Sequence, residues 1–171
     1  MNKEIQIFDD LIDLKTRTVT YQFVKNSLFK IGWEDSKTEE NIRYSFLHSV
    51  YDDNDCANLP VYDKIINSEA GKLVHGLTRK IAMVNLSTPA DVNFVHAHQE
   101  KIGILYYVNL EWRDGWHGET LFYDEAIKKI NFASPYTPGR IIVFDPSIPH
   151  TIRPQSYLAS HYRFTFSMFF S

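Results

Sequence analysis

Apolar residues in the first part of the chain recur at the spacing of one face of an α-helix. The positions concerned are Leu11, Leu14, Val19, Phe23, Val24, Leu28 and Ile31. Gly32 follows them as a plausible C-terminal cap. The polar runs 35–41 and 52–58 are predicted to be surface loops, and residues 60–74 are expected to form a second helix. The pattern therefore predicts helical support over about residues 1–78.

From residue 79 onward the pattern changes to short runs with high β-propensity, broken by turn residues. The predicted strands are 80–86, 92–98, 102–110, 119–123, 129–133, 140–144, 150–153 and 162–170. Short strands at this regular spacing are typical of a β-sandwich or β-barrel. Because no linker or repeat interrupts them, we predict a single domain, residues 1–171, with a β-rich core at about 79–171.

The composition of the chain mainly argues against certain classes of protein. A chain of 171 residues with 44% hydrophobic content can bury one full core. Its formal net charge of −3 lacks the basic excess of a nucleic-acid-binding or polybasic membrane-binding surface. A single cysteine, Cys56, leaves no internal disulfide and fits a reducing compartment. With no apolar run suited to a signal peptide or a membrane span, the expected location is the cytoplasm.

Three histidines in the β-rich part are candidate metal ligands. His96 and His98 lie in residues 94–100, Phe-Val-His-Ala-His-Gln-Glu, and His150 lies at the start of a later predicted strand. Alternate side chains of a strand share a face, so positions 96, 98 and 100 would point the same way. Two members of this set and His150 would give a metal three ligands and leave coordination positions open. Mononuclear non-haem iron sites have this arrangement.

Arg163 is a further candidate, because it lies in an otherwise apolar run. A guanidinium buried alone would be costly, so it needs an anionic partner. The distal carboxylate of a dicarboxylate would satisfy it through paired hydrogen bonds. Thr165 alternates in phase with Arg163 and is expected to line the same pocket. An internal salt bridge or an outward-facing arginine is the alternative, and Arg153 is the next candidate for a carboxylate contact.

Several motifs in order resemble the iron(II)- and 2-oxoglutarate-dependent oxygenases, and within them the prolyl-4-hydroxylase-like branch. The resemblance covers about residues 81–170. Residues 94–98 look like the family's aromatic-aliphatic-His-x-Asp run, and residues 105–109, Leu-Tyr-Tyr-Val-Asn, are similar to its Leu-Tyr-Tyr-Leu-Asn strand. Residues 112–120 end in Trp-His-Gly-Glu-Thr, which resembles the Trp...Gly-Gly-Glu-Thr turn. Residues 138–145, Pro-Gly-Arg-Ile-Ile-Val-Phe-Asp, resemble the strand before the family's distal histidine.

The resemblance implies a double-stranded β-helix, or cupin-like jelly roll, with N-terminal helices packed against one sheet. It also implies Fe(II), the co-substrate 2-oxoglutarate and O2, and usually hydroxylation of an unactivated C–H bond with release of succinate and CO2. Arg163 would hold the distal carboxylate of 2-oxoglutarate, with Tyr107 and Thr165 as further co-substrate contacts. The prime substrate stays open between a prolyl peptide, an amino acid and another small molecule.

One departure from the family concerns the third metal ligand, since His98 stands where the family has aspartate. In one arrangement His96, His98 and His150 bind the metal. In the other Glu100 replaces His96, which then only supports the site through a hydrogen bond. The departure also leaves two other functions open: a non-catalytic jelly-roll binding module with a drifted metal site, and a three-histidine cupin-like dioxygenase that does not use 2-oxoglutarate. Arg163 argues against the last, which would have no dicarboxylate to bind.

Overall fold

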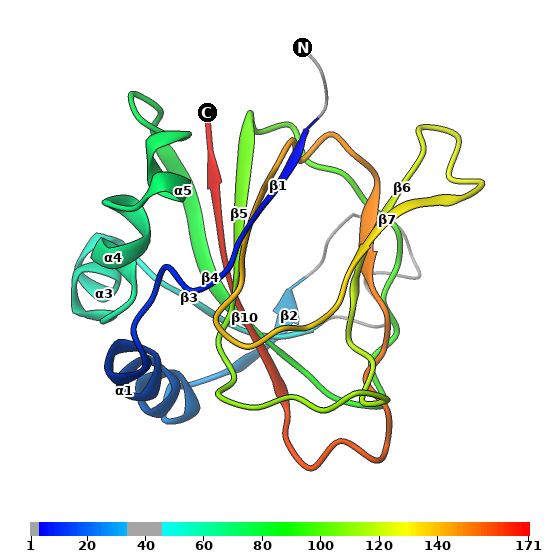
Figure 1. The fold of residues 1–171 in the computed structure, drawn as a ribbon, viewed down its shortest axis with the longest axis horizontal. Coiled ribbons are helices and arrows are strands. Elements are labelled where there is room, and N and C mark those ends of the chain that lie inside the picture. Colours follow the sequence, from blue (N-terminus) through cyan, green and yellow to red (C-terminus); the bar gives the residue numbers. More distant parts are fainter. Residues whose placement is uncertain (1–3, 34–45) are drawn as a thin grey trace.

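The computed structural model describes residues 4–33 and 46–171, and its described part consists of two antiparallel sheets with short helices on one side (Figure 1). The larger sheet has the order β1-β8-β5-β10-β4-β3-β2 and the smaller one β7-β6-β9. The strands of the larger sheet are β1 (Ile5–Phe8), β2 (Lys30–Trp33), β3 (Phe46–Val50), β4 (Arg79–Ser87), β5 (Ile102–Tyr107), β8 (Ile141–Phe144) and β10 (Arg163–Phe170). Those of the smaller sheet are β6 (Thr120–Tyr123), β7 (Ile130–Ser134) and β9 (His150–Ile152).

The chain passes back and forth between the two sheets, since β5, β8 and β10 belong to the larger sheet while β6, β7 and β9 belong to the smaller one. This is the arrangement of a double-stranded β-helix, so the predicted jelly roll is confirmed. The helices pack on the outer face of the larger sheet, as expected (Figure 1). None of the helices in the described ranges is long and apolar enough to cross a lipid bilayer.

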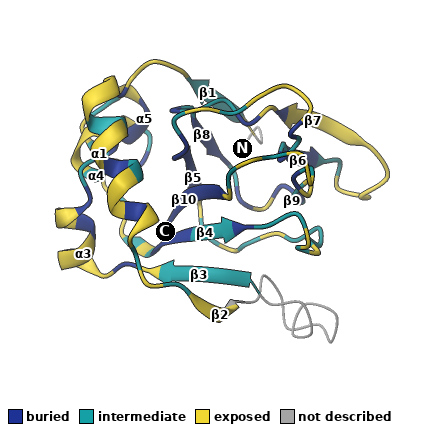
Figure 2. Cartoon of the chain, turned by 90° about the horizontal axis from the view of Figure 1, so that it is seen from below, coloured by how far each residue is buried: buried dark blue, intermediate teal, exposed yellow. Residues whose placement is uncertain are grey.

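Alternation along β10 separates two environments. Phe164, Phe166 and Met168 join the apolar cluster between the larger sheet and the helices. The intervening side chains of β10 face the smaller sheet instead, because successive residues of a strand point to opposite faces. All eight residues of β10 are buried, so its polar members lie inside the molecule (Figure 2). The interior between the sheets is therefore the place for a polar site.

The N-terminal part differs from the helical prediction at its end. Helix α1 (Leu14–Lys25) begins at Asp13, whose carboxylate accepts a hydrogen bond from the Thr16 backbone N–H at 2.9 Å. It ends at Lys25, and the predicted continuation to Ile31 is wrong. Leu28 and Ile31 are 87% and 76% exposed, so they bury no helical face. Residues 30–33 form strand β2 instead, which pairs with β3.

The region between β3 and β4 is more helical than predicted in one place and less continuous in another. Residues 52–58 are mostly helix α3 (Asp53–Asn58) and not a loop, because Asp52 and Asp55 form a reciprocal capping box. The predicted helix over 60–74 is two short helices, α4 (Tyr62–Ile66) and α5 (Glu69–Lys72). The predicted loop 35–41 lies outside the described residues.

The predicted strand over residues 92–98 is also wrong. This segment is irregular and makes only one isolated bridge, between His96 and His150. The other predicted strands are present, with ends that differ by a few residues. The predicted alternation of positions 96, 98 and 100 on one face therefore does not apply, because it requires an extended, paired strand.

Candidate functional site

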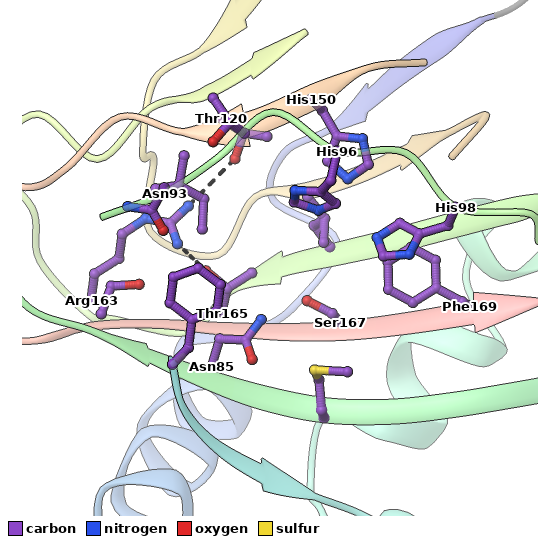
Figure 3. Close-up of a pocket in the computed structure, with 16 residues that line it drawn as sticks. Asn85, Asn93, His96, His98, Thr120, His150, Arg163, Thr165, Ser167 and Phe169 are labelled. Carbon is purple, nitrogen blue, oxygen red and sulfur yellow. Dashed lines mark hydrogen bonds between the residues drawn. The ribbon is translucent and has the colours of Figure 1, made fainter. Parts of the chain in front are cut away.

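The inward-facing side chains of β4 and β10, most of them polar, form one wall of a cavity between the two sheets. The strands are antiparallel, with the paired positions Arg163–Ser87, Thr165–Asn85 and Ser167–Met83. All six of these residues line one cavity, which also receives side chains from β5, β6 and β9 (Figure 3). The cavity has a volume of about 60 Å³, several times what one buried water needs.

Three histidines lie at one end of this cavity (Figure 3). The candidate ligand atoms of His96, His98 and His150 are all within 4.8 Å of one another. Backbone pairing explains their proximity: the N–H of His96 donates to the carbonyl of His150 at 3.0 Å, and the reverse bond measures 2.9 Å. The N–H of His98 donates to the Pro146 carbonyl at 2.9 Å, which ties the same segment to the loop before β9.

Hydrogen bonds orient two of the three imidazoles. His96 Nδ1 lies 3.0 Å from the carbonyl oxygen of Phe94, and His150 Nδ1 lies 2.7 Å from that of Ile148. A carbonyl oxygen only accepts, so each Nδ1 carries the proton and donates it. The lone pair of each ring is then on Nε2, the atom that a metal would need.

Burial keeps the imidazoles of His98 and His150 uncharged. Burial, with the neighbouring His96 as the second cause, lowers the pKa of His98 to about 4. Burial, again with His96 as a secondary cause, lowers the pKa of His150 to about 3. Metal ligation requires the neutral imidazole. Both rings are therefore in the ligating form at neutral pH without losing a proton.

Glu100 does not belong to this cluster. Among the described residues, the group of histidine, cysteine and acidic side chains close enough to share a metal consists of the three histidines. Within the cluster, the ring of His98 also packs on Phe169, with 4.4 Å between the ring centroids. The grouping therefore favours the three-histidine arrangement over the one in which Glu100 replaces His96.

Arg163 is fully buried beside the same cavity, so the alternative of an outward-facing arginine is wrong. Its Nε donates to the Gly118 carbonyl at 2.9 Å, and its Nη1 donates to Thr165 Oγ1 at 2.6 Å. The guanidinium lies over the rings of Tyr107 and Tyr136, 5.3 and 4.8 Å from their centroids. Burial lowers the pKa of Arg163, although it stays a cation.

These partners of Arg163 are neutral. Within residues 4–33 and 46–171, no carboxylate forms an ion pair with it, so the alternative of an internal salt bridge does not hold there. The charge of Glu119 raises the pKa of Arg163 only as a minor cause, and Glu119 forms no ion pair with it, so a further anion would stabilise the buried guanidinium. The geometry is therefore that of an anion-binding site at the end of the cavity opposite the histidines (Figure 3).

Tyr107 lies behind the cavity wall. Its hydroxyl is 2.7 Å from Thr120 Oγ1, and Thr120 lines the cavity while Tyr107 does not. Its ring stacks on Tyr136 at 4.3 Å between centroids. The structure thus gives Tyr107 a role in positioning Thr120 and in supporting Arg163. Arg153 lies outside the cavity, where it pairs with Glu119 at 3.4 Å.

The sequence interpretation missed several cavity residues. Thr120, Asn85, Asn93 and Ser167 all line the cavity. Alternation of Met83, Asn85 and Ser87 in an apolar strand was the available signal for Asn85. Asn93 had none, because its segment is irregular and an asparagine in a loop is common.

No model of a known protein family matches the chain, and no curated protein matches it in sequence. Solved structures do match. A prolyl-4-hydroxylase from Pseudomonas putida aligns over 99% of this chain and 93% of its own, with a TM-score of 0.67 and 13% identity. A prolyl hydroxylase from Trichoplax adhaerens, in complex with a peptide fragment of the hypoxia inducible factor oxygen degradation domain, covers 99% of this chain and 84% of its own (TM-score 0.66, 15% identity). The chain has the fold of these oxygenases.

A 2OG-Fe(II) oxygenase family member from Burkholderia pseudomallei gives the same result, with a TM-score of 0.68 and 11% identity over 98% of this chain and 84% of its own. These likenesses extend over almost the whole described chain, so the oxygenase fold includes the N-terminal helices as well as the two sheets. At such low identities the likeness concerns the fold. The function has to be argued from the cavity itself.

Proposed function

We propose that the protein is an Fe(II)- and 2-oxoglutarate-dependent oxygenase that hydroxylates a C–H bond of a prolyl peptide, an amino acid or another small molecule. The observation that carries this proposal is the combination, within one cavity, of three clustered imidazoles and a buried arginine without a carboxylate partner in the described residues. The oxygenase fold supports it. The peptide in the Trichoplax structure makes a peptidyl substrate one reasonable candidate.

The donor set suits an iron ion. His96, His98 and His150 would be the ligands, since two of the rings are held in the required tautomer and two are kept neutral by burial. Imidazole ligands suit Fe(II), and a site with three protein ligands leaves positions open for further ligands. A set without a carboxylate leaves the full charge of the ion on the site, which strengthens its attraction for an anionic co-substrate.

The other end of the cavity suits the distal carboxylate of 2-oxoglutarate. Arg163 would hold it through the planar guanidinium, with Thr165 and Thr120 as neighbouring hydroxyl groups. Tyr107 would act through Thr120, whose hydroxyl it contacts. Because Arg163 is fixed by Gly118 and by two aromatic rings, little ordering would be required when the co-substrate binds.

Fe(II), 2-oxoglutarate and O2 together would supply the oxidising power for hydroxylation, with release of succinate and CO2. The chain's own contribution is orientation and exclusion of water. Phe169 packs against His98, and Phe144 packs against His150 with 5.0 Å between centroids, so apolar rings surround the histidine end. Such an environment limits solvent access to a reactive centre.

A three-histidine dioxygenase that does not use 2-oxoglutarate is the second candidate. The absence of Glu100 from the histidine cluster favours it, because such enzymes use three imidazoles. Under this function Arg163 would bind an anionic group of the prime substrate itself. The two candidates therefore differ in whether 2-oxoglutarate binds and is consumed.

Calorimetric titration of 2-oxoglutarate into the anaerobic Mn(II) protein, followed by succinate measurement with Fe(II) and O2, tests the proposal. We expect metal-dependent binding of one 2-oxoglutarate per chain and slow succinate formation even without a prime substrate. Glutarate, which lacks the keto group, is the matched control and should bind more weakly. No binding of 2-oxoglutarate to the metal-loaded protein would rule out the first candidate and favour the second.

A further inference from the structure

Two partly buried asparagine side chains that line the cavity each have one solvent-inaccessible amide atom without a hydrogen-bond partner among the described residues. These atoms are Oδ1 of Asn85 and Nδ2 of Asn93, both inaccessible to solvent. A buried polar atom left unpaired destabilises the folded protein, because it has lost its hydrogen bonds to water without replacement. Both residues line the cavity that holds Arg163 and the histidines (Figure 3). The pair therefore offers one free acceptor and one free donor to a ligand.

The two asparagines come from different walls. Asn85 rises from β4, where it is the neighbour of Thr165 on β10. Asn93 belongs to the irregular segment between β4 and β5, three residues before His96. In a trans amide the N–H and the C=O point in opposite directions. An acceptor on one wall and a donor on the other are the complement of such a group.

The charges in the cavity select against a cationic ligand. Its described lining contains Arg163 and three histidines but no aspartate or glutamate. An ammonium group would find no counter-ion there and would face a guanidinium and the metal. A neutral group that both donates and accepts fits the free atoms without this repulsion.

We propose that Asn85 and Asn93 bind an amide group of the prime substrate, with Asn85 Oδ1 accepting from its N–H and Asn93 Nδ2 donating to its carbonyl. This inference rests on the proposed function, because it names the substrate class of the same site. A peptide bond and a primary carboxamide share this chemistry. A free amine does not share it, because an ammonium group has no carbonyl to accept the hydrogen bond of Asn93.

Four probes of similar size separate these groups: N-methylpropanamide for a peptide bond, butanamide for a carboxamide, methyl propanoate for a carbonyl without N–H, and pentylammonium for an amine. Affinities are measured by ligand-observed NMR on the intact protein loaded with diamagnetic Zn(II), with and without 2-oxoglutarate. We expect at least one amide to bind at least about tenfold more tightly than the ester, as one buried hydrogen bond allows. Pentylammonium should not bind.

Two substitutions test which asparagine binds the N–H of the ligand and which binds its carbonyl. Asn85→Leu should remove the preference for amide over ester, because the acceptor for the N–H is lost. Asn93→Leu should weaken amide and ester alike, since both carry the carbonyl. Asn131→Leu, at an exposed position on β7, is the control and should change neither affinity. The tighter of the two amides distinguishes a peptidyl from a carboxamide substrate, and equal affinities still support the shared chemistry.

The proposal is overturned if the wild type shows no amide preference, or if Asn85→Leu retains it in full. Failure of the proposed function is a separate result, namely the absence of 2-oxoglutarate binding in the same samples. The amide-to-ester ratio can be read from the Zn(II) protein in either case. Binding of 2-oxoglutarate to both leucine variants would show that their cavities are intact.

Discussion

His96 and His150 exchange backbone hydrogen bonds in both directions, at 3.0 and 2.9 Å, although they are 54 positions apart in the chain. This single bridge brings the irregular segment before β5 against β9 of the smaller sheet. The side chains of both residues point into the same cavity, with 4.5 Å between their ring centroids. The candidate metal site is therefore held by backbone pairing and does not depend on the order of a flexible loop.

Substitutions at the cluster test which side chains bind the metal. We expect His98→Ala and His150→Ala to abolish Mn(II) binding measured by calorimetry, because each removes one of three ligands. His96→Ala should do the same, and Glu100→Ala should leave the affinity nearly unchanged. His161→Ala is the matched control, since His161 pairs with Glu111 outside the cavity. If Glu100→Ala abolished binding while His96→Ala weakened it only about 10 to 100-fold, as expected for a supporting residue, the ligand set would be the other one.

The three histidines meet, but the reason given by strand alternation is not the one that operates. Residues 92–98 lack a partner strand beyond one bridge, so the local pattern could not place His96, His98 and Glu100 correctly. The bridge between His96 and His150, 54 positions away, fixes where this segment lies. The local pattern of residues 92–98 carries no information on such long-range pairing.

Strand β10 was predictable from the sequence, whereas the end of helix α1 was not. Alternation along β10 put Arg163 and Thr165 on one face, since that strand is paired on both sides. The end of α1 was not predictable from apolar spacing, because Leu28 continues the helical period yet lies exposed. Asn85 and Asn93 carry no motif. Alternation along β4 points to Asn85, whereas nothing in the sequence points to Asn93, and the structure adds that each has a solvent-inaccessible amide atom without a hydrogen-bond partner among the described residues.

Arg163 provides a test of the co-substrate site. We expect Arg163→Lys to raise the dissociation constant of 2-oxoglutarate at least about tenfold, or roughly 1.4 kcal/mol. Lysine keeps the charge but cannot form the paired hydrogen bonds of the guanidinium. Metal affinity should be almost unchanged. Arg153→Lys, at the exposed pair with Glu119, is the control and should bind 2-oxoglutarate like the wild type. Equal affinities in all three proteins would place the carboxylate anchor elsewhere.

Gly118 tests whether the position of Arg163 matters. Gly118 and Gly115 both have a left-handed backbone, with φ of +85° and +83°. A Cβ at Gly118 would lie 3.1 Å from Arg163 Cδ, whereas at Gly115 it would meet nothing within 4 Å. Both alanine variants should lose about 1 kcal/mol of stability from backbone strain. Only Gly118→Ala should also weaken 2-oxoglutarate binding in calorimetry, because it displaces the guanidinium. Equal binding in both variants would contradict this.

The low pKa values of two histidines predict a loss of stability in mild acid for the metal-free protein. The pKa of His98 is about 4 and that of His150 about 3 in the folded state, against about 6.5 in an unfolded chain. Between pH 4 and 6.5 the unfolded state therefore binds more protons, so stability falls as the pH is lowered through this range. Each histidine contributes at most about 1.4 kcal/mol per pH unit.

Urea unfolding with a chelator present, at several values between pH 7 and pH 5, measures this dependence. The range lies above the pH at which most carboxylates titrate, so histidines dominate it. We expect His150→Gln to reduce the slope of unfolding free energy against pH by up to about half, because one of the two buried imidazoles is gone. His75→Gln, at an exposed position, should leave the slope unchanged. If wild type and His150→Gln showed the same slope, His150 would have to be protonated or accessible in the folded protein, and a ligand role at neutral pH would then require proton release on metal binding.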